Sequence, residues 1–149
     1  MDKYQKNSGF TLIEVMIVVA MIAILASLAL GAFSGSSQKA RRADAKASLT
    51  ELAAEQEKYY FREKQYTDNL ANLNASTSSS EGYYTLSAST ATGATGCANA
   101  GACFVLTATA TSGKAQFDDS SCRSFTISNA GSKKAYDSAG TLDASGLCW

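Results

Sequence analysis

The chain has 149 residues, with 13 basic side chains, 13 acidic side chains and no histidine. This length allows one domain together with one membrane or filament segment. A formal net charge of zero does not indicate a nucleic-acid-binding domain, which is normally basic. Without histidine the chain lacks the commonest general base and the commonest zinc ligand. We therefore expect a protein that is not an enzyme and that holds no cofactor and no metal ion.

The first predicted element is a long apolar segment behind a short polar leader. Between Phe10 and Phe33 the only ionisable side chain is Glu14, and the run reaches the roughly 20 residues that a bilayer span needs. Residues 1–9 lack the apolar core of a secretory signal peptide, so hydropathy alone indicates a single-span anchor. A carboxylate inside such a segment costs about 2.5–3.5 kcal/mol on insertion scales and usually has a partner.

The apolar segment continues into an Ala-, Lys- and Glu-rich stretch that favours helix, and no proline occurs in the chain. A helix from Phe10 to about Arg62 would be about 80 Å long at 1.5 Å per residue. This length exceeds one bilayer, so we expect the second half to pack against a globular head. A mostly apolar stripe with intervals of three and four residues supports that packing: Leu49, Leu52, Gln56, Tyr59 and Tyr60.

A cluster of basic residues lies where this helix would leave a membrane: Lys39, Arg41, Arg42 and Lys46. These side chains could contact lipid headgroups or acidic protein surfaces. A solvated helix face is an equally good interpretation, because exposed charges often contribute little. Their position after the span would also favour keeping the following residues in the cytoplasm, whereas the cysteines favour export.

After Glu63 the composition becomes that of a connector and a small sheet. Residues 65–82 are rich in Asn, Ser and Thr, which predicts a loop. Four short runs then predict an antiparallel meander: Tyr83–Ser89, Phe104–Ala110, Ser124–Ser128 and Lys133–Tyr136. One face of this sheet should cover the helix stripe and the other should face water. The predicted fold class is α+β, a long N-terminal α-helix packed on a small antiparallel β-sheet head with disulfides.

The cysteines are concentrated in the C-terminal third: Cys97, Cys103, Cys122 and Cys148. Their spacing fits no zinc pattern. An even number in an exported chain favours disulfides, for which three connectivities are possible, and reduced buried cysteines are the alternative. The terminal Trp149 should fill part of the core beside Cys148, because a large aromatic side chain buries much area.

The string GFTLIEVMIVVAMIAILASLAL closely resembles the signature of type IV pilins. In that family a prepilin peptidase cuts after the glycine, and the new aromatic amine is methylated. The resemblance implies cleavage between Gly9 and Phe10, N-methylation of Phe10 and filament assembly through Glu14. The Phe10 amine of a neighbouring subunit would compensate the Glu14 charge, since burial of an unpaired carboxylate is costly. A protonated Glu14 without a partner is the alternative.

The resemblance implies three parts: a leader peptide (1–9), a membrane or filament-core helix (10–33) and a pilin head (34–149). It implies as partners other pilin subunits, the prepilin peptidase and the inner-membrane assembly machinery. We expect a single-pass inner-membrane precursor with an exported head, followed by an extracellular pilus. Of the disulfide pairings we favour Cys97–Cys103, which closes a short Gly/Ala/Asn loop, and Cys122–Cys148, since a late disulfide fastens the C-terminus in the family.

The strings FDDSSC, FTISNAG and LCW resemble PilE-type minor pilins, a branch that includes a DNA-uptake receptor pilin. The predicted function is therefore a minor pilin in a filament for adhesion, twitching motility or DNA uptake. One alternative is a DNA-binding receptor pilin for competence. Its phosphate contacts would be basic and would weaken with salt, although aspartates interrupt the patch. The candidate contacts are Lys114, Arg123, Lys133 and Lys134, with Tyr136 available to stack.

A second alternative is a pseudopilin of a type II secretion system, whose head often holds calcium. Asp118 and Asp119 are adjacent in the sequence and lack the spaced carboxylates of a convincing calcium site.

Overall fold

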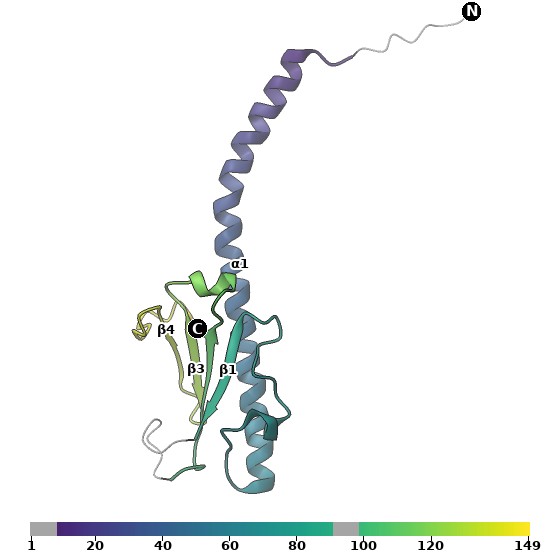
Figure 1. The fold of residues 1–149 in the computed structure, drawn as a ribbon. Coiled ribbons are helices and arrows are strands. Elements are labelled where there is room, and N and C mark those ends of the chain that lie inside the picture. Colours follow the sequence, from purple (N-terminus) through teal and green to yellow (C-terminus); the bar gives the residue numbers. More distant parts are fainter. Residues whose placement is uncertain (1–8, 91–98) are drawn as a thin grey trace, which may run out of the picture. The chain divides into compact units, whose positions relative to one another are not determined.

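The computed structural model describes residues 9–90 and 99–149, apart from the side chains of residues 28–34. The chain divides into two compact units, Met1–Ser37 and Gln38–Trp149. In the second unit a helix packs on a four-stranded antiparallel sheet (Figure 1). The predicted α+β fold is confirmed.

Helix α1 spans Leu12–Glu63, 52 residues, in agreement with the predicted helix from Phe10 to about Arg62. Thr11 caps its N-terminus, because the Glu14 backbone N–H donates to Thr11 Oγ1 at 3.3 Å. At the other end Lys64 takes a left-handed backbone conformation with φ 59°. Its N–H donates to the Tyr60 carbonyl at 2.8 Å, which is the usual way to end a helix.

The predicted membrane segment, residues 10–33, extends into residues 28–34, whose side chains are outside the described part of the chain. Among the described residues, no helix combines the length and the apolar character needed to cross a membrane.

The sheet is a meander in the order β1-β2-β3-β4. Its strands are β1 (Tyr84–Ser89), β2 (Val105–Ala110), β3 (Ser124–Ser128) and β4 (Lys133–Tyr136), each within one residue of its predicted bounds. Adjacent strands are antiparallel throughout. Gly131, at φ 73°, donates its N–H to the Ser128 carbonyl at 2.9 Å in the predicted turn from β3 to β4. A backbone conformation with positive φ favours glycine at this position.

The core lies between the inner face of the sheet and α1. Tyr84, Leu106 and Phe125 are fully buried against the Ala45–Leu49–Leu52 stripe. Along β1 and β3 buried residues alternate with more exposed ones, so the prediction of one covered face is confirmed. Tyr60 departs from the predicted stripe: it is 40% exposed and stacks on Tyr66 with ring centroids 4.6 Å apart.

The connector is more ordered than its composition predicted. It contains a 3₁₀-helix, η1 (Leu70–Leu73), capped by the Asn69 side chain at its start and by Asn74 in a left-handed conformation at its end. The buried side-chain amide of Gln56 exchanges two hydrogen bonds with the Thr67 backbone, at 2.5 and 3.1 Å. This pair fastens the connector to α1. A second 3₁₀-helix, η2 (Ala115–Asp118), follows β2 and was not predicted.

Candidate functional site

The N-terminal end of α1 carries the predicted cleavage and assembly residues. Gly9 and Phe10 are exposed, and open space surrounds Gly9, so nothing in the described part of the chain obstructs the peptide bond between them. Glu14 lies in the first turn of α1. It lines a shallow groove of about 260 Å³ with Phe10, Val15, Val18 and Val19. The roles of Gly9, Phe10 and Glu14 in processing and assembly stay predictions.

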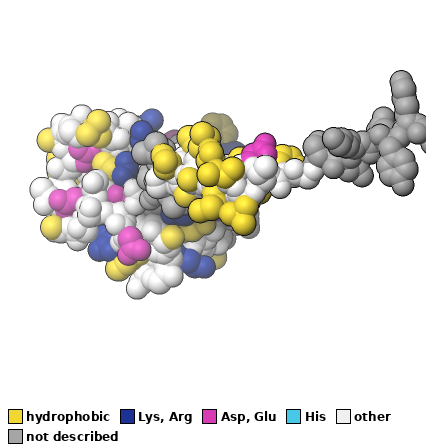
Figure 2. Space-filling model, turned by 90° about the horizontal axis from the view of Figure 1, so that it is seen from above, with side chains coloured by type: hydrophobic (Ala, Val, Ile, Leu, Met, Phe, Trp, Pro, Cys, Tyr) yellow, Lys and Arg dark blue, Asp and Glu magenta, His cyan; other side chains and the backbone are white. Residues whose placement is uncertain are grey.

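The same stretch of α1 exposes its apolar side chains. Phe10 is 83% exposed and Leu12 79%. In Figure 2, which looks onto the N-terminal end of α1, yellow hydrophobic side chains gather around the helix. An exposed apolar surface of this extent indicates an interaction with another protein or with a membrane. Neither of the two ion pairs in the described part of the chain involves Glu14.

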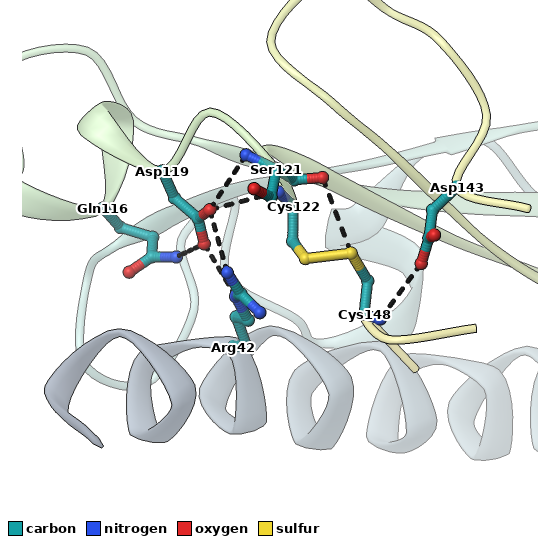
Figure 3. A network of polar contacts seen from close by, with 7 residues as sticks. All are labelled: Arg42, Gln116, Asp119, Ser121, Cys122, Asp143 and Cys148. Atoms are coloured by element: carbon teal, nitrogen blue, oxygen red, sulfur yellow. Dashed lines mark hydrogen bonds and ion pairs between the residues drawn. A yellow bond between two sulfur atoms is a disulfide. The ribbon is translucent and has the colours of Figure 1, made fainter. Parts of the chain in front are cut away.

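A polar network fastens the head to α1 (Figure 3). Arg42 donates to both carboxylate oxygens of Asp119, from Nε at 2.7 Å and from Nη2 at 3.0 Å. Gln116 Nε2 donates to the same carboxylate at 2.7 Å, and the backbone N–H groups of Ser121 and Cys122 donate at 3.2 and 3.1 Å. Burial alone would raise the pKa of Asp119, but hydrogen bonds from Arg42 and the Cys122 backbone outweigh it and hold that pKa below its ordinary value.

Of the four residues in the basic cluster on α1, Lys39 is exposed as a solvated face would require, whereas the other three contact the head. Arg42 forms an ion pair with Asp119, whose side chain is buried in the head. Arg41 lies over the Tyr83 ring, 4.9 Å from its centroid. Lys46 lies over Phe125 at 5.8 Å, and burial, with the nearby Arg42 charge, lowers the pKa of Lys46. Local sequence could not reveal the Arg42–Asp119 pair, because its members are 77 residues apart.

The predicted disulfide Cys122–Cys148 is present, with Cα atoms 5.7 Å apart. Asp143 accepts the Cys148 backbone N–H at 3.0 Å, so a carboxylate holds the backbone on each side of the bond (Figure 3). Cys103 is also in a disulfide, whereas Cys97, its predicted partner, lies outside the described residues.

The terminal Trp149 is half-buried against the core, as predicted. Its indole N–H donates to the Lys134 carbonyl at 2.6 Å, and its ring meets Phe125 edge-on with centroids 5.8 Å apart.

The structure does not gather the four basic candidates for DNA contact into one patch. The Arg123 guanidinium lies 3.6 Å from the Phe117 ring centroid and donates to the Phe117 carbonyl. Lys133 Nζ lies 5.3 Å from the Trp149 ring centroid. Lys134 points to the opposite face of β4, because successive side chains of a strand alternate. It shares that outer face with Tyr136. Lys114 is exposed in the loop before η2.

In the described part of the chain, no group of three or more acidic, cysteine or histidine side chains could hold a metal ion. Asp118 and Asp119 also lie in different environments: Asp118 is exposed, whereas Asp119 is buried and paired with Arg42.

Comparisons with known proteins give two family matches and one relative. A family described as type IV minor pilin ComP, DNA uptake sequence receptor, matches residues 32–126. The prokaryotic N-terminal methylation motif matches residues 4–30. The type IV major pilin protein PilA of Myxococcus xanthus (strain DK1622) is 40% identical over 63 residues, which cover 42% of this chain and 29% of that protein. The similarity therefore spans less than a third of the relative's length.

Proposed function

The chain belongs to the family described as type IV minor pilin ComP, DNA uptake sequence receptor, and on this basis we propose that it is a minor subunit of a type IV pilus that serves DNA uptake. One observation carries the proposal. The methylation motif at residues 4–30 and the family match at residues 32–126 meet on one helix, α1, whose N-terminal part exposes its apolar side chains. Such a helix needs other helices or lipid around it, and a filament of pilins supplies them.

The proposed assembly begins with cleavage between Gly9 and Phe10 by a prepilin peptidase and methylation of the new Phe10 amine. Apolar helices then bundle and exclude water. A Glu14 carboxylate in that bundle would carry a large desolvation cost unless a positive charge meets it. The Phe10 amine of an adjacent subunit is the cation that the processed sequence offers, so the pair selects both charge and register.

The proposed location follows from the same steps. The precursor lies in the inner membrane with its head exported, where the assembly machinery adds it to other pilins in an extracellular filament. The Cys122–Cys148 disulfide supports export, because disulfides persist in oxidising compartments.

DNA contact by the head is the second part of the proposal, and membership of a family described as a DNA uptake sequence receptor supports it. Lys134 and Tyr136 share the outer face of β4, where a cation and a ring could meet a phosphate and a base. The head carries no large basic surface from Lys114, Arg123 and Lys133 together, so we expect weak binding that falls with salt.

The assembly proposal is tested by the intact, non-reduced mass of this chain in filaments sheared from the cell surface. We expect the mass of Phe10–Trp149 plus one methyl group, less four hydrogens for two disulfides. An uncut chain confined to the membrane fraction would leave only a single-span anchor. Recovery from a secretion-system pseudopilus instead of pili would favour the pseudopilin alternative.

The DNA proposal is tested on the compact unit Gln38–Trp149, mixed with labelled duplex DNA at several salt concentrations. We expect a shift in mobility at low salt that disappears as salt rises. No shift at any salt concentration would remove DNA contact from this head.

A further inference from the structure

The peptide bond proposed for cleavage lies just outside the N-terminal end of α1. Helix α1 begins at Leu12, and its first hydrogen bond runs from the Val15 N–H to the Thr11 carbonyl at 3.3 Å. Gly9, Phe10 and Thr11 are not helical. The Gly9 and Phe10 carbonyls accept no backbone hydrogen bond within the described part of the chain. Helical bonding therefore begins at the Thr11 carbonyl, two residues after Gly9.

The Thr11 side chain stabilises this helix start. Its Oγ1 accepts the Glu14 N–H at 3.3 Å, one of the N–H groups that the first turn of a helix leaves without a carbonyl partner. Threonine is among the residue types that favour this capping position. The bond uses the backbone of Glu14 and not its carboxylate. It is therefore separate from the assembly role proposed for that side chain.

A pair of apolar residues supports the same start. Phe10 precedes the cap and Val15 is the fourth residue of the helix, and both line the shallow groove beside Glu14. Apolar residues at these two positions often pack on each other and fix the direction in which the chain enters the helix. Phe10 still leaves most of its side chain exposed, so the peptide bond before it stays open to an enzyme.

The position of the helix start matters for hydrolysis because of the Gly9 carbonyl. Ser8 and Gly9 are also residue types that favour capping. A helix that started from either would bond the Gly9 carbonyl to the Ile13 N–H. In hydrolysis a water oxygen adds to that carbonyl carbon, and donors of the enzyme must reach the carbonyl oxygen as it gains negative charge. The C–N bond then breaks, and the Phe10 nitrogen takes a proton and leaves as an amine.

We propose that Thr11 is a positioning residue for cleavage by the prepilin peptidase. By capping α1 at residue 11, it keeps the Gly9 carbonyl out of helical bonding, so the bond to be cut reaches the enzyme in a non-helical conformation. Thr11 takes no part in the bond changes themselves. This inference rests on the proposed function, since it needs a peptidase that cuts between Gly9 and Phe10.

The test is the kinetics of cleavage of the full-length precursor, in detergent micelles, by a purified prepilin peptidase. Thr11→Val keeps the shape of the side chain and removes the oxygen that caps the helix. Loss of the cap lowers the fraction of precursor in the non-helical form, and an enzyme that binds only this form then shows a higher KM. We expect KM to rise about two- to fivefold, with kcat unchanged.

Two further variants separate this role from a direct contact between the threonine side chain and the enzyme. Thr11→Ser and Thr11→Asn change the shape of the side chain but are at least as good at capping a helix. We expect both to keep KM at or below the parent value. The matched control is Thr50→Val, which makes the same chemical change at an exposed position further along α1 and should leave KM and kcat unchanged.

A parent value of KM for Thr11→Val would overturn the proposal. An equal rise in KM for Thr11→Asn and Thr11→Val would overturn it as well, because the peptidase would then recognise the threonine side chain itself. Failure of the enzyme to cut the parent precursor between Gly9 and Phe10 would instead contradict the proposed processing, and the inference with it.

Discussion

Apolar and acidic side chains have opposite environments in the two units of this chain. In Met1–Ser37 the described apolar side chains are exposed, with Phe10 83% exposed, and Glu14 has no ion-pair partner among the described residues. In Gln38–Trp149 the apolar side chains form a closed core. The Asp119 carboxylate there accepts hydrogen bonds from Arg42, Gln116 and the Cys122 backbone. The exposed apolar side chains of the first unit need other molecules to cover them, whereas the second unit buries its own apolar core.

The largest expected effect is that of a substitution at Glu14. We expect Glu14→Ala to be cleaved and to fold, but to be almost absent from filaments. The variant would leave the neighbouring amine buried without a partner, and an uncompensated buried charge costs about 3–5 kcal/mol. The measurement is the ratio of processed chain in sheared pili to processed chain in membranes. Glu63→Ala is the matched control, and normal piliation by Glu14→Ala would remove the assembly role.

Within the head, the largest expected loss follows removal of the Cys122–Cys148 disulfide. The double variant Cys122→Ser/Cys148→Ser opens a loop with a sequence separation of 26 residues. The chain-entropy estimate for such a loop is about 3.5 kcal/mol. Urea unfolding of the Gln38–Trp149 unit would measure it. A loss below about 1 kcal/mol would show that the carboxylate contacts alone hold this end of the chain.

Asp119→Ala should cost about 3 kcal/mol of unfolding free energy, because it leaves Arg42 and two backbone N–H groups without their acceptor. The neighbouring Asp118 is exposed, so Asp118→Ala should stay within about 0.5 kcal/mol of the parent. The same urea experiment compares the two. Equal small effects would mean that the head does not need its tie to α1.

The acid stability of the head should depend on Asp119 and Asp143, since hydrogen bonds to each carboxylate outweigh desolvation and hold its pKa below the ordinary value. A depressed pKa in the folded state gives stability that is present above the unfolded pKa of 3.8 and is lost as pH falls through the folded value. We expect a flat profile near neutrality, since the chain has no histidine, and a decline below about pH 4.

The control for this decline is Asp119→Asn, which keeps the shape and removes the charge. Its stability should start lower and fall less steeply with acid. A parent profile that already declines between about pH 5 and 7 would point to a different titrating group.

The smallest expected effect separates the two lysines of β4. Lys134→Ala should weaken DNA binding by the Gln38–Trp149 unit and reduce the slope of log affinity against log salt by about 0.9, the amount for one phosphate contact. Lys133→Ala should change the slope less, because that ammonium lies over Trp149. Equal slopes for both variants would exclude the outer face of β4 as the contact surface.

Local patterns predicted most of the fold because its elements have clear periods. Strict alternation located β1 and β2, and the three-and-four spacing identified Leu49 and Leu52 as the buried stripe. The connector helix η1 was missed, because its start depends on one Asn69 cap in a stretch whose composition is that of a loop.

The contacts of the head were harder to predict, for a different reason. The Arg42–Asp119 pair joins residues that only the finished fold brings together. The same spacing argument that placed Leu52 in the core also placed Tyr60 there, but Tyr60 is 40% exposed and stacks on Tyr66 of the connector.

In the proposed pilus, a pull along α1 would act on the loop before β3 through the Arg42–Asp119 pair. Beyond that loop, Cys122 is tied to Cys148. If the head were drawn out, residues 122–148 would stay closed, which removes about 90 Å from the length that the extended chain could reach. The disulfide therefore sets a limit on how far a stretched subunit can lengthen.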